Sequence, residues 1–383
     1  MKYRLLGRTG IRVSEIGIGC EGFSGKKTAG TAEMLDAAME AGINFMDVYT
    51  SDPWLRRDLG AAFARYPRNS WVMQGHFCSA WRDGQYFRTR DPAQTKVMFE
   101  ELMALMRVEY VDVGMIHYVD DLTDLDGVMN GPIYAYIRLL KKRGVIRSVG
   151  LSTHNPTVAK AAVESGEVDV IMMSINPAYD MLPPGENVDE LFDPRTFRRP
   201  YEGIDPRREE LYRLCQAEGV ALTVMKPFAG GVLLDAARSP FGRAMTPTQC
   251  IRYALDRPGV ASVLGGMGSV GEIREAVAYE NATPEERDYS EILSCRPDSR
   301  FSGHCFYCGH CAPCPVGIPV AAVNKYLDLA QAQGTVFETV ADHYRLLPAH
   351  GGDCIACGAC ESRCPFGVPV REKMRQAADL FEK

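Results

Sequence analysis

Short apolar runs alternate with helical patterns over most of the chain. Eight runs are nearly continuous in hydrophobic residues, as is typical of parallel strands that are buried on both faces. They cover residues 15–20, 44–50, 71–77, 112–119, 147–153, 168–176, 221–228 and 261–268. The stretches between them predict helices, several of which end at glycine, and include residues 31–42, 92–107, 132–144 and 155–166. Eight strand–helix units predict a (β/α)8 TIM barrel.

Two features qualify this prediction. A doubly wound open sheet is the alternative fold, but no G-x-G-x-x-G motif follows the first predicted strand to support it. The connection at residues 177–206 is much longer than a usual strand–helix loop. In a barrel it lies on the catalytic face, where it is either a lid or substrate wall, or a solvated surface excursion.

The C-terminal part carries two dense cysteine motifs. Each has the form C-x2-C-x2-C followed by a last cysteine and a proline, which is the bacterial ferredoxin pattern, although the first motif is one residue shorter at its last step. The eight cysteines are Cys305, Cys308, Cys311 and Cys314 in the first motif and Cys354, Cys357, Cys360 and Cys364 in the second. We therefore predict a barrel over residues 1–282 and a small, mainly helical, ferredoxin-like iron–sulfur domain over residues 283–383.

In the ferredoxin pattern, the fourth cysteine of each motif ligates the other cluster. One [4Fe–4S] cluster is then predicted on Cys305, Cys308, Cys311 and Cys364, and a second on Cys354, Cys357, Cys360 and Cys314. Paired four-cysteine zinc sites are the alternative, because C-x2-C is also a zinc spacing. Helical patterns at 320–334 and 336–347 separate the two motifs.

Composition and charge limit the classes of partner. The 383 residues carry a net charge of −6 without a basic run, which argues against nucleic acid. No apolar stretch reaches membrane-spanning length, and the N-terminal residues do not form a signal peptide. We expect a cytoplasmic protein with a small-molecule substrate. A redox carrier such as ferredoxin is a candidate partner for the clusters.

The segment INFMDVYTSDPW places several polar groups at the end of the second apolar run. Asp47 ends the run, and Tyr49 and Asp52 follow it closely. His76 and His117 end the third and fourth runs. In a barrel, the carboxyl ends of all strands meet at one face, so these groups are candidates for an active site.

Several segments together resemble the aldo-keto reductases. They are GRTGIRVSEIGIGC, AGINFMDV, VDVGMIHYVD, GVIRSVGLST, MKPFAGGVL and VLGGMGSVGEI. With the cysteine motifs, the chain resembles the aldo-keto reductase-like proteins that carry a ferredoxin-type iron–sulfur domain. The resemblance implies a barrel that binds NAD(P)H without a Rossmann fold. It also implies an Asp, Tyr, Lys, His tetrad in which tyrosine is the general acid and lysine lowers its pKa.

The tetrad carries over only in part. Asp47 and His117 occupy the family's Asp and His positions, whereas Asp52 stands where the Tyr is expected. The Lys position falls at His76 or at the glycine before it. Three hypotheses follow: Tyr49 is a displaced acid with His76 as its partner; Asp52, His76 and His117 form a different acid–base set; or the barrel does not reduce carbonyls. A metal site on the aspartates and histidines is a further alternative.

The cofactor contacts are also partly kept. The resemblance assigns them to Ser152, Thr153, Lys226, Gly230, Gly266, Gly268 and Ser269. Gly268 and Ser269 precede a predicted helix, whose N-terminus suits an anion. Glu272 stands where an arginine often holds the 2′-phosphate, and a carboxylate repels that group, so NADH is favoured over NADPH.

The combined prediction is an iron–sulfur oxidoreductase of aldo-keto reductase type that acts on a small carbonyl or hydroxyl substrate. Two alternatives stay open. One is a lyase, dehydratase or isomerase on the same barrel, and the other is an electron-transfer protein with a silent barrel. Nucleotide binding separates the oxidoreductase from the last alternative.

Overall fold

The computed structural model describes residues 1–181, 203–294, 309–333, 338–364 and 366–382, together with residues 303, 305, 307 and 336. The described chain divides into two compact units, the first ending at Tyr289 and the second beginning at Ser290. The sequence predicts a boundary after residue 282, in a stretch that the structure assigns to the first unit. The two units are described separately below.

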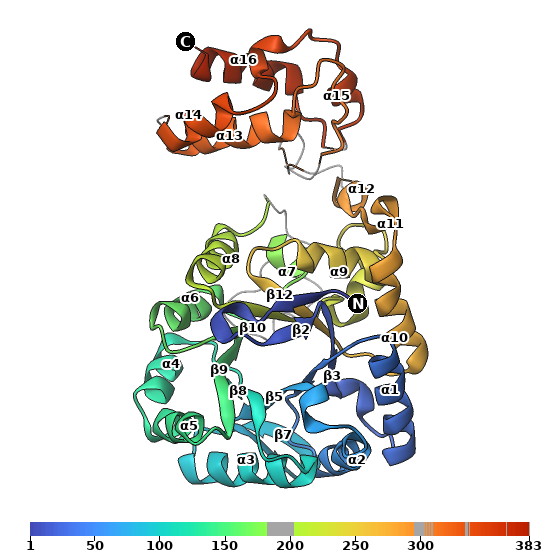
Figure 1. Ribbon diagram of the computed structural model, residues 1–383, viewed down its shortest axis with the longest axis vertical. Helices are drawn as coiled ribbons and strands as arrows, with labels where there is room; N and C mark the ends of the chain where they lie inside the picture. The colour runs from blue at the N-terminus through green and yellow to red at the C-terminus, as the bar shows by residue number, and fades with distance from the viewer. Residues whose placement is uncertain are drawn as a thin grey trace. The chain divides into compact units, whose positions relative to one another are not determined.

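The first unit is a closed barrel of eight parallel strands, each hydrogen-bonded to its neighbour in chain order (Figure 1). The strands are β3 (Ile16–Gly19), β4 (Phe45–Val48), β5 (Val72–Phe77), β8 (Val111–Ile116), β9 (Ile146–Thr153), β10 (Val170–Ser174), β11 (Ala221–Met225) and β12 (Val260–Gly265). Every one of them overlaps one of the eight predicted apolar runs. The predicted (β/α)8 barrel is therefore confirmed.

Helices surround the barrel strands (Figure 1). They are α1 (Thr28–Glu40), α2 (Pro53–Phe63), α3 (Pro92–Met106), α4 (Leu122–Met129), α5 (Pro132–Lys142), α6 (Pro156–Glu164), α7 (Pro177–Met181), α8 (Pro206–Glu218), α9 (Pro247–Leu255), α10 (Val270–Val277) and α11 (Pro284–Arg287). Many begin at a proline that follows a side chain accepting hydrogen bonds from the first turn, such as Asp91 before α3 and Asn155 before α6. These caps fix where each loop at the carboxyl end of a strand gives way to its helix.

The amino-terminal end of the barrel is closed by an antiparallel hairpin of β1 (Tyr3–Leu5) and β2 (Arg12–Ser14). Leu6 and Val13 next to it are fully buried in one apolar cluster with Phe45, Val72 and Val113 from the starts of three barrel strands. Burial of this kind stabilises the fold by about 25 cal/mol for each Å² removed from water. This hairpin does not cover the opposite end of the barrel, where the carboxyl ends of the strands lie and a functional site can form.

The loops at the carboxyl end differ in length. A second hairpin, β6 (Ser79–Arg82) with β7 (Gln85–Arg88), follows β5. Short 3-10 helices follow β3 and β11, namely η2 (Cys20–Phe23) and η6 (Ala229–Leu234). Most of the long connection that the sequence predicts as a lid, residues 182–202, lies outside the described residues.

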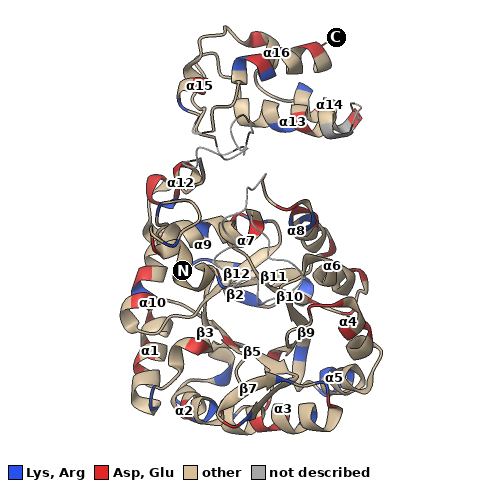
Figure 2. Cartoon of the chain, turned by 180° about the vertical axis from the view of Figure 1, so that it is seen from behind, with Lys and Arg blue, Asp and Glu red and all other residues tan. Residues whose placement is uncertain are grey.

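The described part of the second unit is helical, as the sequence predicts for this region. It contains α12 (Ser290–Ser294), α13 (Val320–Gln333), α14 (Glu338–Arg345), α15 (Ala359–Ser362) and α16 (Val370–Phe381). Val323 and Leu327 of α13 and Met374 of α16 are buried in its core. Acidic and basic residues are interspersed along the helices of both units (Figure 2). Among the described helices, none is long and apolar enough to cross a membrane.

Candidate active site at the carboxyl end of the barrel

Three predicted site residues form one hydrogen-bonded chain across neighbouring strands. Asp47 lies on β4, His76 on β5, and His117 directly after β8. His76 Nε2 is 2.8 Å from Asp47 Oδ1, and His76 Nδ1 is 2.9 Å from His117 Nδ1. Gln74 precedes His76 by two residues, so the two side chains point to the same side of β5, and Gln74 donates to the same Asp47 oxygen at 2.7 Å.

For an ionised Asp47 and a neutral His76, the chain of contacts determines where the protons lie. The Asp47 carboxylate can only accept, so in neutral His76 the hydrogen is on Nε2 and the Nδ1 atom must accept. His117 then donates through its Nδ1, which leaves its Nε2 without a hydrogen. This buried Nε2 has no hydrogen-bond partner among the described residues. It is therefore a proton acceptor without a donor among the residues that the structure describes.

Electrostatics favour the neutral form of the terminal histidine. Burial lowers the pKa of His117 well below its usual value, and the charges of His76, Arg90, His154 and Arg88 lower it further. A buried imidazole surrounded by cations resists protonation because desolvation and like charge both disfavour the charged form. Near neutral pH, the Nε2 atom therefore presents its lone pair.

Tyr49 forms an aromatic wall beside the histidines. Its ring is nearly parallel to that of His117, with centroids 6.2 Å apart, and meets Tyr86 edge-on at 6.1 Å. Burial and the charges of Cys20, Glu21 and Asp47 raise the pKa of Tyr49, which makes its phenol a weaker acid. Both nitrogens of His76 are already engaged, so the hypothesis of Tyr49 as a displaced acid with His76 as its partner does not fit the geometry.

Asp52 has a structural role that the acid–base hypothesis did not foresee. It is the N-cap of α2, and its Oδ1 accepts from the backbone N–H groups of Trp54 at 2.9 Å and Leu55 at 3.2 Å. It hydrogen-bonds to neither of the two histidines, all three residues being described. The carboxylate that contacts His76 is Asp47.

The alternative of a metal site finds no support in the same region. The structure describes both aspartates and both histidines, and within the described residues no group of three or more His, Cys, Asp or Glu side chains is arranged to hold a metal ion.

The hydroxyls predicted to meet a nicotinamide carboxamide are engaged within the protein. Ser152 Oγ accepts from the backbone N–H of Tyr118 at 2.8 Å, and Thr153 Oγ1 donates to Asp120 Oδ1 at 2.9 Å. Both residues lie at the end of β9. They hold the loop that follows β8 in place.

A second hydrogen-bonded chain lies at the same end of the barrel. Asp120 Oδ2 is 2.9 Å from His154 Nδ1, and His154 Nε2 is 3.1 Å from Lys226 Nζ. Hydrogen bonds from His154 keep the pKa of Asp120 low, so this carboxyl stays ionised despite its burial. Burial lowers the pKa of Lys226, against the opposing effect of Asp120 and Glu21. Lys226 follows β11 directly and precedes the Gly230 turn.

The last glycine loop, residues 265–269, is partly hydrogen-bonded by the helix that follows it. Ser269 caps α10 by accepting from the N–H of Glu272 at 3.1 Å. Glu272 Oε2 in turn accepts from the N–H of Gly268 at 2.8 Å. An incoming phosphate therefore competes with this carboxylate for the Gly268 N–H. A Cβ placed at Gly266 would have only the side chain of the exposed Glu21 within 4 Å, so the backbone there is otherwise open.

Sequence reasoning left Gln74, Asp120 and Tyr86 out of the site. Gln74 could have been found, because alternate residues of a strand share a face and His76 was already a candidate. Asp120 lies three residues after His117 in a loop, where the sequence has no periodicity to indicate its direction. Tyr86 comes from a hairpin that no apolar run predicts.

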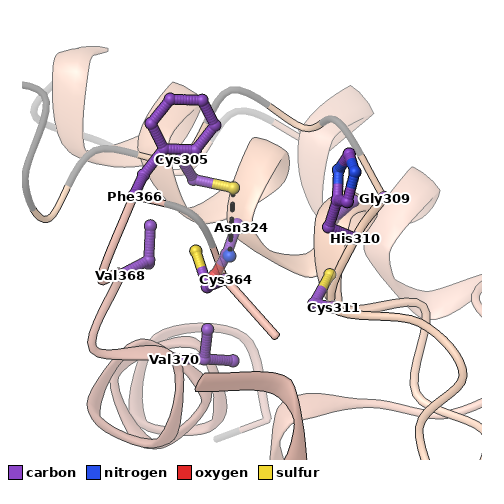
Figure 3. A pocket seen from close by; sticks show the side chains of 10 residues that line it. Cys305, Gly309, His310, Cys311, Asn324, Cys364, Phe366, Val368 and Val370 are labelled. Carbon is purple, nitrogen blue, oxygen red and sulfur yellow. Dashed lines mark hydrogen bonds between the residues drawn. The ribbon is translucent and has the colours of Figure 1, made fainter. Parts of the chain in front are cut away.

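Three thiols surround a pocket in the second unit. Cys305 and Cys311 come from the first motif and Cys364 from the second, and Figure 3 shows them around one hollow with Phe366 and Val370. Asn324 Nδ2 lies 3.3 Å from Cys305 Sγ.

Four of the other predicted ligands do not line this pocket. Cys314, Cys354, Cys357 and Cys360 are described but do not line it, and Cys308 lies outside the described residues. Cys360 is buried, whereas Cys357 is exposed. The charge of Cys354 contributes to the raised pKa of Cys360, so these two thiols lie within electrostatic range of each other.

Comparison with known proteins decides the family. A model of the Aldo/keto reductase family matches residues 15–249. The chain belongs to the aldo/keto reductase family. Membership of this family and the names of curated relatives confirm the prediction of an oxidoreductase. The uncharacterized oxidoreductase YqkF of Bacillus subtilis (strain 168) is 23% identical over 315 residues, which are 74% of this chain and 92% of that protein.

Two further comparisons agree with this assignment. The L-galactose dehydrogenase of Arabidopsis thaliana is 24% identical over 330 residues, covering 76% of this chain and 93% of that protein. The holo form of aldo-keto reductase AKR11C1 from Bacillus halodurans has a TM-score of 0.59 at 23% identity, covering 78% of this chain and 97% of that structure. This structural likeness supports the barrel fold of the family member described here.

Proposed function

We propose that this aldo/keto reductase interconverts a hydroxyl and a carbonyl group of a small substrate, with His117 handling the proton. The observation that carries the proposal is the chain Asp47–His76–His117, which ends at a buried Nε2 atom without a partner among the described residues. A hydroxyl group placed at that atom supplies the missing donor.

The proton path follows from the tautomers. Nε2 of His117 takes the proton of the substrate hydroxyl, and the proton on its Nδ1 passes across 2.9 Å to Nδ1 of His76. His76 then becomes an imidazolium beside the Asp47 carboxylate, which stabilises that charge. Carbonyl reduction runs the same path in reverse. A bound nicotinamide supplies or accepts the hydride.

The described loops fit a dinucleotide in part. At Gly230 and Gly231, no atom lies within 4 Å of the place a Cβ would take, so their backbone is open to a phosphate. Glu272 and the exposed Glu21 place negative charge near the last glycine loop. This charge distribution favours NAD(H) over NADP(H), because the latter carries an additional phosphate.

We further propose that the second unit binds two [4Fe–4S] clusters. Cys305, Cys308, Cys311 and Cys364 are the proposed ligands of one, and Cys314, Cys354, Cys357 and Cys360 those of the other. The first assignment is supported by the pocket that thiols from both motifs line, and by the Asn324 amide beside Cys305. Clusters of this kind carry single electrons, so a ferredoxin-like carrier in the cytoplasm is the proposed partner.

The barrel chemistry is tested by nucleotide titration and substrate screening. NADH and NADPH are titrated into anaerobically purified protein, and oxidation of sugars and hydroxy acids is followed with NAD+. The name of the Arabidopsis relative makes L-galactose a sensible first substrate. We expect NADH to bind and a His117→Ala variant to lose turnover. Absence of nucleotide binding contradicts the proposal and favours a silent barrel.

The clusters are tested separately on the same preparation. Iron and sulfide analysis together with EPR should give about eight irons for each chain if both clusters are intact. Replacing Cys364 with serine should reduce the iron content by about half, and Cys250→Ser, at a buried cysteine of the barrel, is the matched control. Zinc in place of iron, without acid-labile sulfide, contradicts the proposal.

A further inference from the structure

We propose that Lys226 is a nucleophilic lysine that forms an imine with a carbonyl compound, with His154 as its base. This activity is separate from hydride transfer and needs no nucleotide. It rests on the second hydrogen-bonded chain at the barrel mouth, Asp120–His154–Lys226.

The distances match those of an activated nucleophile. Lys226 Nζ is 3.1 Å from His154 Nε2, which is within the range over which a base takes a proton from its nucleophile. His154 Nδ1 is 2.9 Å from Asp120 Oδ2, so its hydrogen lies on Nδ1 and its Nε2 is the acceptor. The arrangement is a carboxylate, an oriented imidazole and a nucleophile in sequence.

Asp120 is held in place from several sides. Its Oδ1 accepts from the backbone N–H of His154 at 2.7 Å and from Thr153 Oγ1 at 2.9 Å, while its backbone carbonyl accepts from Asn155 Nδ2 at 3.1 Å. The imidazole is therefore fixed at both its ring and its backbone. Asp120 acts as a positioning residue, since it reaches the amine only through His154.

The backbone at Lys226 is unusual for its residue type. Its φ is 54°, in the left-handed region that a lysine rarely adopts, and its carbonyl accepts from the buried Asn176 Nδ2 at 2.9 Å. Backbone strain of this kind occurs at functional sites more often than elsewhere. The side chain is partly exposed, so a small carbonyl compound can reach it.

The environment shifts Lys226 toward its neutral amine, which is the reactive form. Desolvation by burial is the main cause of the lowered pKa of Lys226. A direct salt bridge to a carboxylate normally has the opposite effect, as it does for Lys160 beside Glu210. Lys226 has an imidazole among its hydrogen-bonded neighbours, and the Nε2 atom of this imidazole can accept the ammonium proton.

The proposed step balances without a redox partner. Lys226 transfers a proton to His154 Nε2, and the free electron pair of Nζ attacks the carbonyl carbon. His154 returns the proton to the oxygen, giving a carbinolamine. Loss of water then leaves a protonated imine on Lys226. The carbon retains its oxidation state, and one water is released for each imine formed.

Reductive trapping tests this proposal directly. The full-length protein is incubated with pyruvate and sodium cyanoborohydride at pH 7 without nucleotide, and labelled lysines are identified by peptide mass spectrometry. Lys96, whose side chain is 57% exposed, serves as the reference within the same chain. A lowered pKa raises the neutral fraction of an amine, so we expect Lys226 to be labelled faster than Lys96.

Two variants separate activation from mere accessibility. His154→Gln should reduce labelling of Lys226 to the rate of Lys96, while labelling of Lys96 and the circular dichroism spectrum report that the fold is intact. Asp120→Asn should move the pH profile of Lys226 labelling to lower pH, because the Asp120 charge raises the pKa of Lys226. Labelling of Lys226 no faster than Lys96, or unchanged labelling in the folded His154→Gln protein, overturns the proposal.

Discussion

Replacing His76 with glutamine separates proton transfer from simple hydrogen bonding. A glutamine amide can still donate to the Asp47 carboxylate, as His76 Nε2 does over 2.8 Å. An imidazole can accept a proton from His117 at Nδ1 while it keeps its own proton at Nε2. A glutamine amide cannot do this. His76→Gln is therefore expected to keep most of the buried contact and to interrupt the path between His117 and Asp47.

The expected magnitude follows from the role of the residue. Positioned acid–base groups contribute about 10²- to 10⁴-fold to a rate, so kcat/KM should fall by that factor. This corresponds to about 2.7–5.4 kcal/mol in the activation free energy. Turnover is measured on the substrate found by screening. The tautomer of His117 is measured independently by ¹⁵N NMR, where the Nδ1–H form should persist in the variant because the glutamine oxygen can still accept from Nδ1.

Gln74 provides the matched control. It donates to the same Asp47 oxygen at 2.7 Å but lies outside the proposed proton path. Gln74→Met removes a hydrogen bond to a charged group, which costs about 1.5–3 kcal/mol of stability, and should leave kcat/KM within about tenfold. The reasoning is refuted if both variants lose activity equally at equal stability, or if His76→Gln retains full turnover.

Three further predictions concern stability and cofactor choice. Burial lowers the pKa of His117 in the folded protein, so below pH 6.5 the unfolded chain binds a proton that the folded chain does not. The free energy of unfolding, measured with urea, should therefore fall by about 1.4 kcal/mol for each pH unit below 6.5. In His117→Asn this slope should be smaller. Asp180→Ala leaves the buried Arg208 without its carboxylate partner at 2.7 Å, which should cost about 3–5 kcal/mol in urea unfolding, against less than about 1 kcal/mol for Glu209→Ala on the surface. Glu272→Gln removes a carboxylate from the last glycine loop and should tighten NADPH binding more than NADH binding by about fivefold in fluorescence titrations, or about 1 kcal/mol, at low salt.

The barrel could be predicted because each buried parallel strand is an apolar run of limited length. The site could be predicted only as a location. His76 and His117 were candidates because they end neighbouring runs, but the contact between their Nδ1 atoms depends on how far β5 and β8 are offset. A sequence does not specify that offset, nor which ring nitrogen faces which partner.

The capping role of Asp52 is a different case, because the sequence contains the signal for it. An aspartate directly before a proline is a common start of a helix, with the aspartate as N-cap and the proline in the first turn. The same pattern recurs before α3 and α8. Asp52 was instead interpreted by its place in the family tetrad, and the local capping signal was overlooked.

The two hydrogen-bonded chains at the barrel mouth are electrostatically linked. The charge on His154 contributes to the low pKa of His117, so protonation of one histidine disfavours protonation of the other. Hydroxyl oxidation places a proton on the His117 chain, whereas imine formation places one on His154. The two proposed reactions therefore disfavour each other through the charge that each places on its histidine. Trapping of pyruvate on Lys226 should then slow as the pH is lowered and protons accumulate on the chain that ends at Asp47.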